Sequence, residues 1–155
     1  MFSVYMVCFF GHRQIDDFRT IEQWIEQLVD KLLNEHEYVE FLIGRDGEFD
    51  HLVTFAIRRC RKHLDAANCS VTWVIPYLKS DYIKNQKSYD NYYDSVEVCE
   101  QSANAHPKSA IQIRNRAMVD RSDLCVFCVT HKSGGACQTL RYAEKADSNI
   151  INLRK

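Results

Sequence analysis

The turn formed by Ser133, Gly134 and Gly135 is the feature of the sequence with the clearest chemical potential. It follows the apolar run Leu124–Thr130 and precedes a segment with helical spacing, Ala136–Ala146. A strand that leads through glycines into a helix lets backbone N–H groups approach a ligand, at the positive end of the helix dipole. The pattern therefore predicts a phosphate site. The alternative is a plain tight turn in which Ser133 caps the helix.

An arginine and an amide precede this strand on a predicted helix that runs from about Ser109 to Arg121. Arg114 and Asn115 lie near the start of that helix, where a guanidinium could hold a phosphate or carboxylate through two parallel hydrogen bonds. The alternative for Arg114 is a solvated helical side chain. Thr139, on the helix after the glycine turn, adds a hydroxyl group.

Two further loops follow predicted strands. The first loop contains Gly11–Arg13 and the second contains Gly44–Phe49. Because ligands of parallel sheets bind beyond the carboxyl ends of the strands, we expect these loops and the glycine turn to share one crevice. Asp50 is interpreted as a charge that favours the N-terminus of its helix. The candidate ligand-binding residues are Gly11, His12, Arg13, Gly44, Arg45, Arg114, Asn115, Ser133, Gly134, Gly135 and Thr139.

Other catalytic and metal-binding patterns receive little support from the sequence. The histidines have no recognisable nucleophile context, and the nucleophile-elbow motif G-x-S-x-G does not occur. Cys125 and Cys128 form a C-x-x-C pair within an apolar run, where residues three apart point to opposite faces of a strand. We therefore predict no metal site and no cofactor, and Arg114 is the sole candidate should any reaction be catalysed.

Strands and helices alternate along the chain, which predicts an α/β protein. Apolar runs predict strands, and apolar residues at helical spacing predict helices. The strands are Ser3–Phe10, Glu40–Ile43, Ser70–Ile75, Leu124–Val129 and Ile150–Leu153, with a further short one plausible around Val96–Cys99; the helices are Phe18–Asn34, Phe49–His63, Ser109–Arg121 and the segment from Gly134 to about Asp147. This order predicts a Rossmann-like three-layer sandwich with a mostly parallel sheet of about five strands, formed by residues 1–155 as a single domain.

Composition narrows the class of protein further. The net charge of the 155 residues is −1, which argues against broad attraction to nucleic acid, so nucleic acid is predicted to be an unlikely partner. No apolar run approaches the roughly 20 residues of a membrane span. Seven cysteines without regular spacing favour the reducing cytoplasm. The sequence leaves the oligomeric state open, and a homo-oligomer is possible.

Four segments, taken together and in order, resemble the SLOG superfamily of Rossmann-like domains and, within it, the small YpsA-like proteins. These segments are Cys8–Arg13, Leu42–Asp50, Arg114–Asp123 and Lys132–Ala143, followed by Ile150–Asn152. The resemblance implies a nucleotide or a nucleotide-derived ligand, such as a nucleotide sugar or an NAD-related molecule, held at the carboxyl ends of the strands. It also strengthens the prediction of a phosphate site at the glycine turn.

One enzymatic branch of that superfamily, the cytokinin-activating LOG proteins, cleaves the N-glycosidic bond of nucleoside monophosphates. The resemblance places Arg114 and Met118 on the arginine motif of that branch. However, Arg141 or Tyr142 stands where the branch has a glutamate. A carboxylate assists such cleavage by stabilising the oxocarbenium-like state or by activating water. Its absence favours ligand binding or sensing over catalysis, with a nucleotide glycosidase, or a protein-interaction module that docks through the Tyr-rich segment Tyr77–Tyr93, as alternatives.

Overall fold

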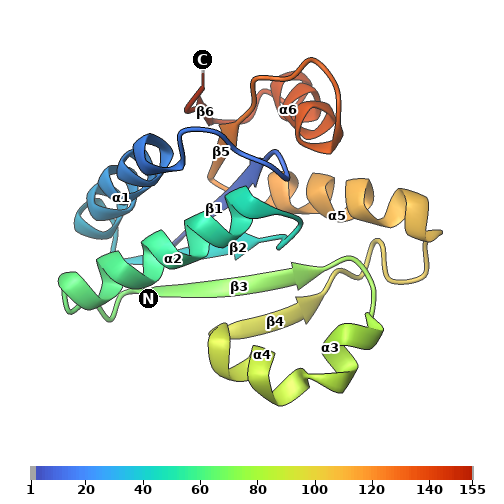
Figure 1. The fold of residues 1–155 in the computed structure, drawn as a ribbon, viewed down its shortest axis with the longest axis horizontal. Coiled ribbons are helices and arrows are strands. Elements are labelled where there is room, and N and C mark those ends of the chain that lie inside the picture. The colour runs from blue at the N-terminus through green and yellow to red at the C-terminus, as the bar shows by residue number, and fades with distance from the viewer. Residues whose placement is uncertain (1–2, 155) are drawn as a thin grey trace.

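One sheet of six parallel strands forms the centre of the protein. The computed structural model describes residues 3–154 (Figure 1). The strands are β1 (Val4–Gly11), β2 (Tyr38–Ile43), β3 (Cys69–Ile75), β4 (Ser95–Val98), β5 (Leu124–Cys128) and β6 (Ile150–Asn152), in the spatial order β4-β3-β2-β1-β5-β6. The helices are α1 (Phe18–Glu35), α2 (Glu48–His63), α3 (Ser80–Lys84), α4 (Gln86–Tyr92), α5 (Pro107–Arg121) and α6 (Gly135–Lys145).

Helices cover both faces of the sheet, and each face has its own hydrophobic core. Successive side chains of a strand point to opposite faces, so Phe9 packs beneath α1 and α2 while Phe10 packs beneath α5 and α6. Cys125 and Cys128 of β5 likewise belong to different cores, so their side chains point to opposite faces of the sheet, as the three-residue spacing predicts. The predicted three-layer α/β sandwich is confirmed.

The sheet has six strands where the sequence predicts about five. The two edge strands are short, Ser95–Val98 with four residues and Ile150–Asn152 with three. Short edge strands carry little periodic pattern, and this explains the uncertainty in the count. All five strand pairs are parallel. Among the described residues, no helix is long and apolar enough to cross a membrane.

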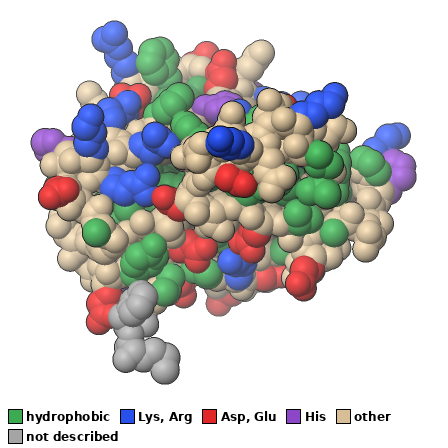
Figure 2. All heavy atoms as spheres, turned by 90° about the horizontal axis from the view of Figure 1, so that it is seen from below, with side chains coloured by type: hydrophobic (Ala, Val, Ile, Leu, Met, Phe, Trp, Pro, Cys, Tyr) green, Lys and Arg blue, Asp and Glu red, His purple; other side chains and the backbone are tan. Residues whose placement is uncertain are grey.

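The Tyr-rich segment, which the sequence leaves without clear elements, forms α3 and α4 beside the edge of the sheet. Its aromatic rings turn inward: Tyr82, Tyr89 and Tyr93 surround Trp73 of β3 with ring centroids 4.8–5.7 Å from it. The outer face of this region carries basic, acidic and hydrophobic side chains interspersed (Figure 2). The tyrosines thus extend the core rather than forming an exposed aromatic surface.

Candidate functional site

A cavity of about 620 Å³ lies at the carboxyl ends of the strands. From β1 the chain continues through α1 to β2 on one side, whereas β5, its other neighbour, is reached only after α5. This reversal is the topological switch point at which open α/β sheets bind ligands. The cavity is lined by Phe10, Gly11, His12, Arg13, Gln14, Asp46, Asp50, Ile111, Asn115, His131, Ser133, Gly134, Gly135 and Ala136.

Seven of the eleven candidate residues of the sequence lie on this cavity. They come from the loops after β1 and β5 and from α5: Gly11, His12, Arg13, Asn115, Ser133, Gly134 and Gly135. The remaining four, which do not line it, are Gly44, Arg45, Arg114 and Thr139. The structure thus brings together loops far apart in the chain, as the position of each loop after a strand predicts.

The glycine turn presents the uncapped N-terminus of α6 to the cavity. Gly134 has φ 99°, a left-handed conformation that favours glycine, and a side chain added there would meet nothing within 4 Å. No side chain caps the helix, so Ser133 does not act as its cap, and the first turn contains no acidic residue. The first N–H groups of a helix have no partner within it, and their dipoles attract anions. This geometry suits a phosphate group.

Thr139 and Asn115 form hydrogen bonds that stabilise the first turn of α6. The buried Thr139 hydroxyl donates to the carbonyl of Gly135 (2.9 Å) and lies 3.2 Å from Asn115 Nδ2, which donates to it. Gln112 Nε2 donates to the same carbonyl at 3.0 Å. Thr139 therefore supports the glycine turn without facing the cavity.

Arg114 is fully buried, which neither sequence interpretation anticipates. Its Nη1 donates to the carbonyls of Gly44 (3.1 Å) and Val74 (3.2 Å), and its Nε donates to Asn115 Oδ1 (3.1 Å). Its Nη2 forms an ion pair with Asp46. The guanidinium thus joins the ends of β2 and β3 to the loop that borders the cavity, and it neutralises a carboxylate there.

His12 links the loop after β1 to the loop after β5. Its Nε2 accepts hydrogen bonds from the backbone N–H groups of Thr130 (3.0 Å) and His131 (3.2 Å). Its ring stacks on that of His131 with a centroid distance of 3.9 Å. Burial, with a contribution from His131, lowers the pKa of His12. A neutral imidazole is therefore favoured, as the acceptor role of Nε2 requires.

Arg45 points away from the cavity into the aromatic cluster. It has φ 59°, and its guanidinium lies 5.1 Å from the ring centre of Tyr89 and 5.7 Å from that of Trp73. Its Nη1 donates to the Tyr93 hydroxyl at 2.9 Å. Cation–π attraction to these rings therefore stabilises the Arg45 guanidinium in this position.

Two carboxyl groups that the sequence analysis does not place at the site, those of Asp46 and Asp50, line the cavity. Asp50 is only 7% exposed, and its Oδ2 accepts the backbone N–H of Asp46 at 2.7 Å. Burial, together with the neighbouring charge of Asp46, raises the pKa of Asp50 to about 7. A signal in the sequence could have found this pair. The two aspartates are four residues apart, in a loop that contains glycine and follows a strand, so both lie at the start of the next helix.

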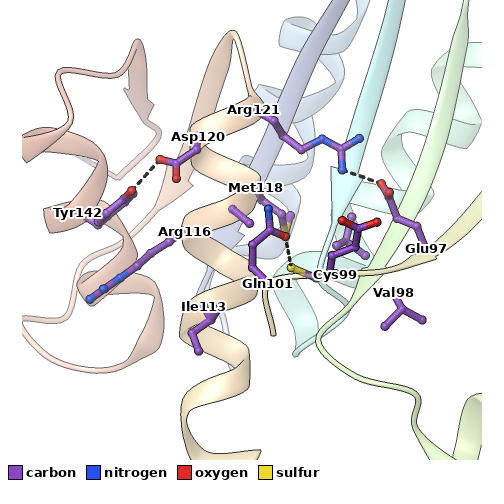
Figure 3. A pocket seen from close by; sticks show the side chains of 13 residues that line it. Glu97, Val98, Cys99, Gln101, Ile113, Arg116, Met118, Asp120, Arg121 and Tyr142 are labelled. Carbon is purple, nitrogen blue, oxygen red and sulfur yellow. Dashed lines mark hydrogen bonds and ion pairs between the residues drawn. The ribbon is translucent and has the colours of Figure 1, made fainter. Parts of the chain in front are cut away.

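A second cavity, of about 680 Å³, lies between β4, α5 and Tyr142 of α6 (Figure 3). Its polar side chains largely satisfy one another. Arg121 pairs with Glu97 at 2.8 Å, and the Tyr142 hydroxyl donates to Asp120 at 2.7 Å. The first cavity, at the topological switch point, is therefore the better candidate site, because it has an uncapped helix end and two neighbouring carboxyl groups, of which that of Asp50 is buried.

The sequence matches no protein-family model, and no curated protein matches it significantly. Solved structures do share its architecture. DNA processing protein A (DprA) of Streptococcus pneumoniae superposes with a TM-score of 0.67 at 18% identity, and that of Helicobacter pylori with 0.64 at 14%. The molybdenum cofactor carrier protein of Chlamydomonas reinhardtii gives 0.61 at 14%. The chain has a Rossmann-like fold.

The aligned regions cover 95%, 94% and 98% of this chain, in the same order. They span 49% of the pneumococcal DprA chain, 63% of the Helicobacter chain and 78% of the carrier protein. The chain therefore spans about half the length of the first of these proteins. At these identities the likeness concerns the fold.

The prediction that nucleic acid is an unlikely partner is wrong as an inference from overall charge. The Helicobacter DprA structure describes a single-stranded DNA binding mode, and that protein has the same fold. The net charge of −1 is an average over the whole chain. Nucleic-acid binding depends instead on local phosphate contacts, which helix N-termini also provide.

Proposed function

We propose that the switch-point cavity binds a nucleotide-type ligand, with a phosphate group at the N-terminus of α6. The observation that carries this proposal is the uncapped glycine turn on a cavity that loops after three strands enclose. Arg13 adds a positive charge to the lining of the same cavity. The volume of about 620 Å³ lies within the range of small-ligand pockets, roughly 300–1,000 Å³.

The proposed ligand class includes free nucleotides, nucleotide derivatives and short single-stranded DNA, since all present a phosphate beside a sugar and a base. The fold shared with DprA supports the inclusion of DNA. The same fold, with the four sequence segments in their order, supports a proposed place in the SLOG superfamily. Within that superfamily, the YpsA-like proteins are the group that the segments resemble.

A ligand screen by thermal unfolding tests the proposal. A ligand present at 100 times its dissociation constant stabilises the native state by about 2.7 kcal/mol, which is readily measured. The screen contains inorganic phosphate, ribose 5-phosphate, mononucleotides, nucleotide sugars, NAD and a short oligo-dT. Stabilisation by none of these at millimolar concentration would remove the proposal.

The variant Gly135→Asp places a carboxylate beside the proposed phosphate position. We expect it to abolish the ligand-induced shift, because like charges would compete at the helix N-terminus. Ala146→Asp is the matched control, since it adds the same charge at the exposed far end of α6. Equal ligand shifts in the two variants would contradict the phosphate assignment.

A second candidate function is cleavage of the N-glycosidic bond of a nucleoside 5′-monophosphate. One observation favours it: the cavity contains the carboxyl group of Asp50, whose pKa is raised to about 7. A general acid or base works best with a pKa near the operating pH. Chromatographic detection of free adenine released from AMP, lost in Asp50→Asn, supports this function. Complete recovery of AMP excludes it for that substrate.

A further inference from the structure

The carboxyl group of Asp50 contains a buried oxygen atom without a partner. Asp50 is 93% buried, and its Oδ2 accepts the Asp46 N–H, whereas its Oδ1 has no hydrogen-bond partner among the described residues. A buried polar atom left unsatisfied costs free energy, so native proteins rarely retain one without a role. Asp50 lines the switch-point cavity, although this oxygen itself is shielded from solvent. A molecule bound in the cavity would supply the missing partner once the lining moves enough to admit its donor.

The cavity offers two different kinds of polar surface. The glycine turn contributes N–H donors and the positive end of α6. The loop after β2 and the start of α2 contribute carboxyl groups, those of Asp46 and Asp50. Asp46 is fixed by its ion pair with the buried Arg114, so its orientation is set by the protein. A complementary ligand is anionic where it meets the turn and donates hydrogen bonds where it meets the aspartates.

We infer that Asp50, with Asp46 beside it, receives the amino-bearing ring edge of a guanine-type base whose phosphate occupies the glycine turn. This inference rests on the proposed function and names the ligand within it. Above its pKa of about 7 the Asp50 carboxyl group is ionised, and an ionised carboxylate only accepts hydrogen bonds. The guanine edge presents two adjacent donors, the ring N1–H and the 2-amino group. The corresponding edge of adenine presents one donor and one acceptor, and therefore matches less well.

The inference is tested by calorimetric titration of the full chain with GMP, IMP, AMP and ribose 5-phosphate. IMP lacks only the 2-amino group of GMP, and ribose 5-phosphate lacks the base altogether. A hydrogen bond to a charged group contributes enough for about a tenfold to hundredfold change in affinity. We therefore expect GMP to bind at least about tenfold more tightly than IMP, AMP and ribose 5-phosphate.

The variant Asp50→Asn keeps the shape of the side chain and removes its charge. We expect it to reduce the affinity for GMP to about that for IMP and to leave the affinity for ribose 5-phosphate unchanged. Asp65→Asn is the matched control, because Asp65 is exposed in the turn after α2. The GMP-to-IMP ratio of the unaltered protein tests the inference without any variant, should Asp50→Asn fail to fold.

The outcomes separate the inference from the proposed function. If ribose 5-phosphate binds but GMP binds no more tightly than IMP, or AMP binds best, the guanine assignment is wrong and phosphate binding stands. The same conclusion follows if Asp50→Asn retains the full preference for GMP. If none of the four compounds binds, the proposed function fails together with the inference. Cleavage of GMP, with its affinity unchanged in Asp50→Asn, would assign Asp50 to catalysis and overturn the inference.

Discussion

Replacement of Asp50 by asparagine is expected to stabilise the ligand-free protein, and to do so in a pH-dependent manner. The side chain is buried beside Asp46, and these surroundings raise its pKa from an ordinary 3.8 to about 7. Between these two pH values the folded protein retains a proton that the unfolded chain has released. Stability therefore falls as the pH rises from about 4 to about 7, and is constant with respect to this group above that range.

The size of the effect follows from the same pKa values. Each pH unit of difference corresponds to about 1.4 kcal/mol, so the full penalty of ionised Asp50 is about 4 kcal/mol. Between pH 5 and pH 8 ionisation of Asp50 should therefore lower the free energy of unfolding by about 3 kcal/mol. Asparagine carries no such penalty, and its amide oxygen can still accept the Asp46 N–H. The free energy of unfolding of Asp50→Asn should therefore exceed that of the unaltered protein increasingly above pH 5.

Urea unfolding followed by circular dichroism at pH 5, 6, 7 and 8 measures this difference. Asp65→Asn again serves as the control, because it makes the same chemical change at an exposed position. A difference for Asp50→Asn that is independent of pH would refute the reasoning, because it would mean that Asp50 is ionised throughout. A stabilising variant that loses ligand affinity is the expected behaviour of a group retained for function at the expense of stability.

Three further variants test the framework of the site. Arg114→Met leaves the buried partners of the guanidinium without a donor and should lower the unfolding free energy by about 3–5 kcal/mol in urea, against about 1 kcal/mol or less for Arg121→Met in its exposed pair. Gly134→Ala should lower it by about 1–3 kcal/mol through φ alone, since nothing crowds the added methyl group. His12→Phe keeps a ring against His131 but removes the acceptor of two backbone N–H groups. It should lower the free energy of unfolding by about 1 kcal/mol. Because the pKa of His12 is lowered, its own contribution to stability should be lost as the pH falls below 6.5. The free energy of unfolding of the unaltered protein relative to His12→Phe should therefore decrease below that pH, and equal slopes for the two proteins would contradict the link.

The fold could be predicted from the sequence because its strands and long helices carry strong periodic patterns. The predicted helix Phe18–Asn34 and the observed one differ by a single residue at the C-terminus. The helices α3 and α4, in contrast, contain five and seven residues and are held by rings packed on Trp73. Short helices are stabilised by tertiary contacts rather than by their own pattern. No local reading of Tyr77–Tyr93 could therefore place them.

The loops of the site could be predicted, but the orientation of individual side chains could not. The position of a loop after a parallel strand follows from the order of elements, and this placed Gly11–Arg13 and the glycine turn on one cavity. Whether Arg114 faces a ligand or the core depends on which carbonyls lie opposite it. Those carbonyls, of Gly44 and Val74, are 70 and 40 residues away in the chain. Asp46 lies 68 residues from Arg114, so its ion pair with that guanidinium could not be predicted from the local sequence either.

The burial of Arg114 bears on which part of a ligand could meet the two aspartates of the cavity. Two adjacent carboxylates repel each other, and the neighbouring charge of Asp46 contributes to the raised pKa of the buried Asp50, whereas Arg114 lowers it. The positive charge of Arg114 thus reduces the electrostatic cost of placing the carboxyl group of Asp50 next to that of Asp46. An arginine that contacted a ligand phosphate directly would leave Asp46 uncompensated. In the proposed binding mode the phosphate therefore meets the backbone N–H groups of the glycine turn. Arg114 instead pairs with Asp46 at the end of the cavity that offers acceptors to a donor-bearing base.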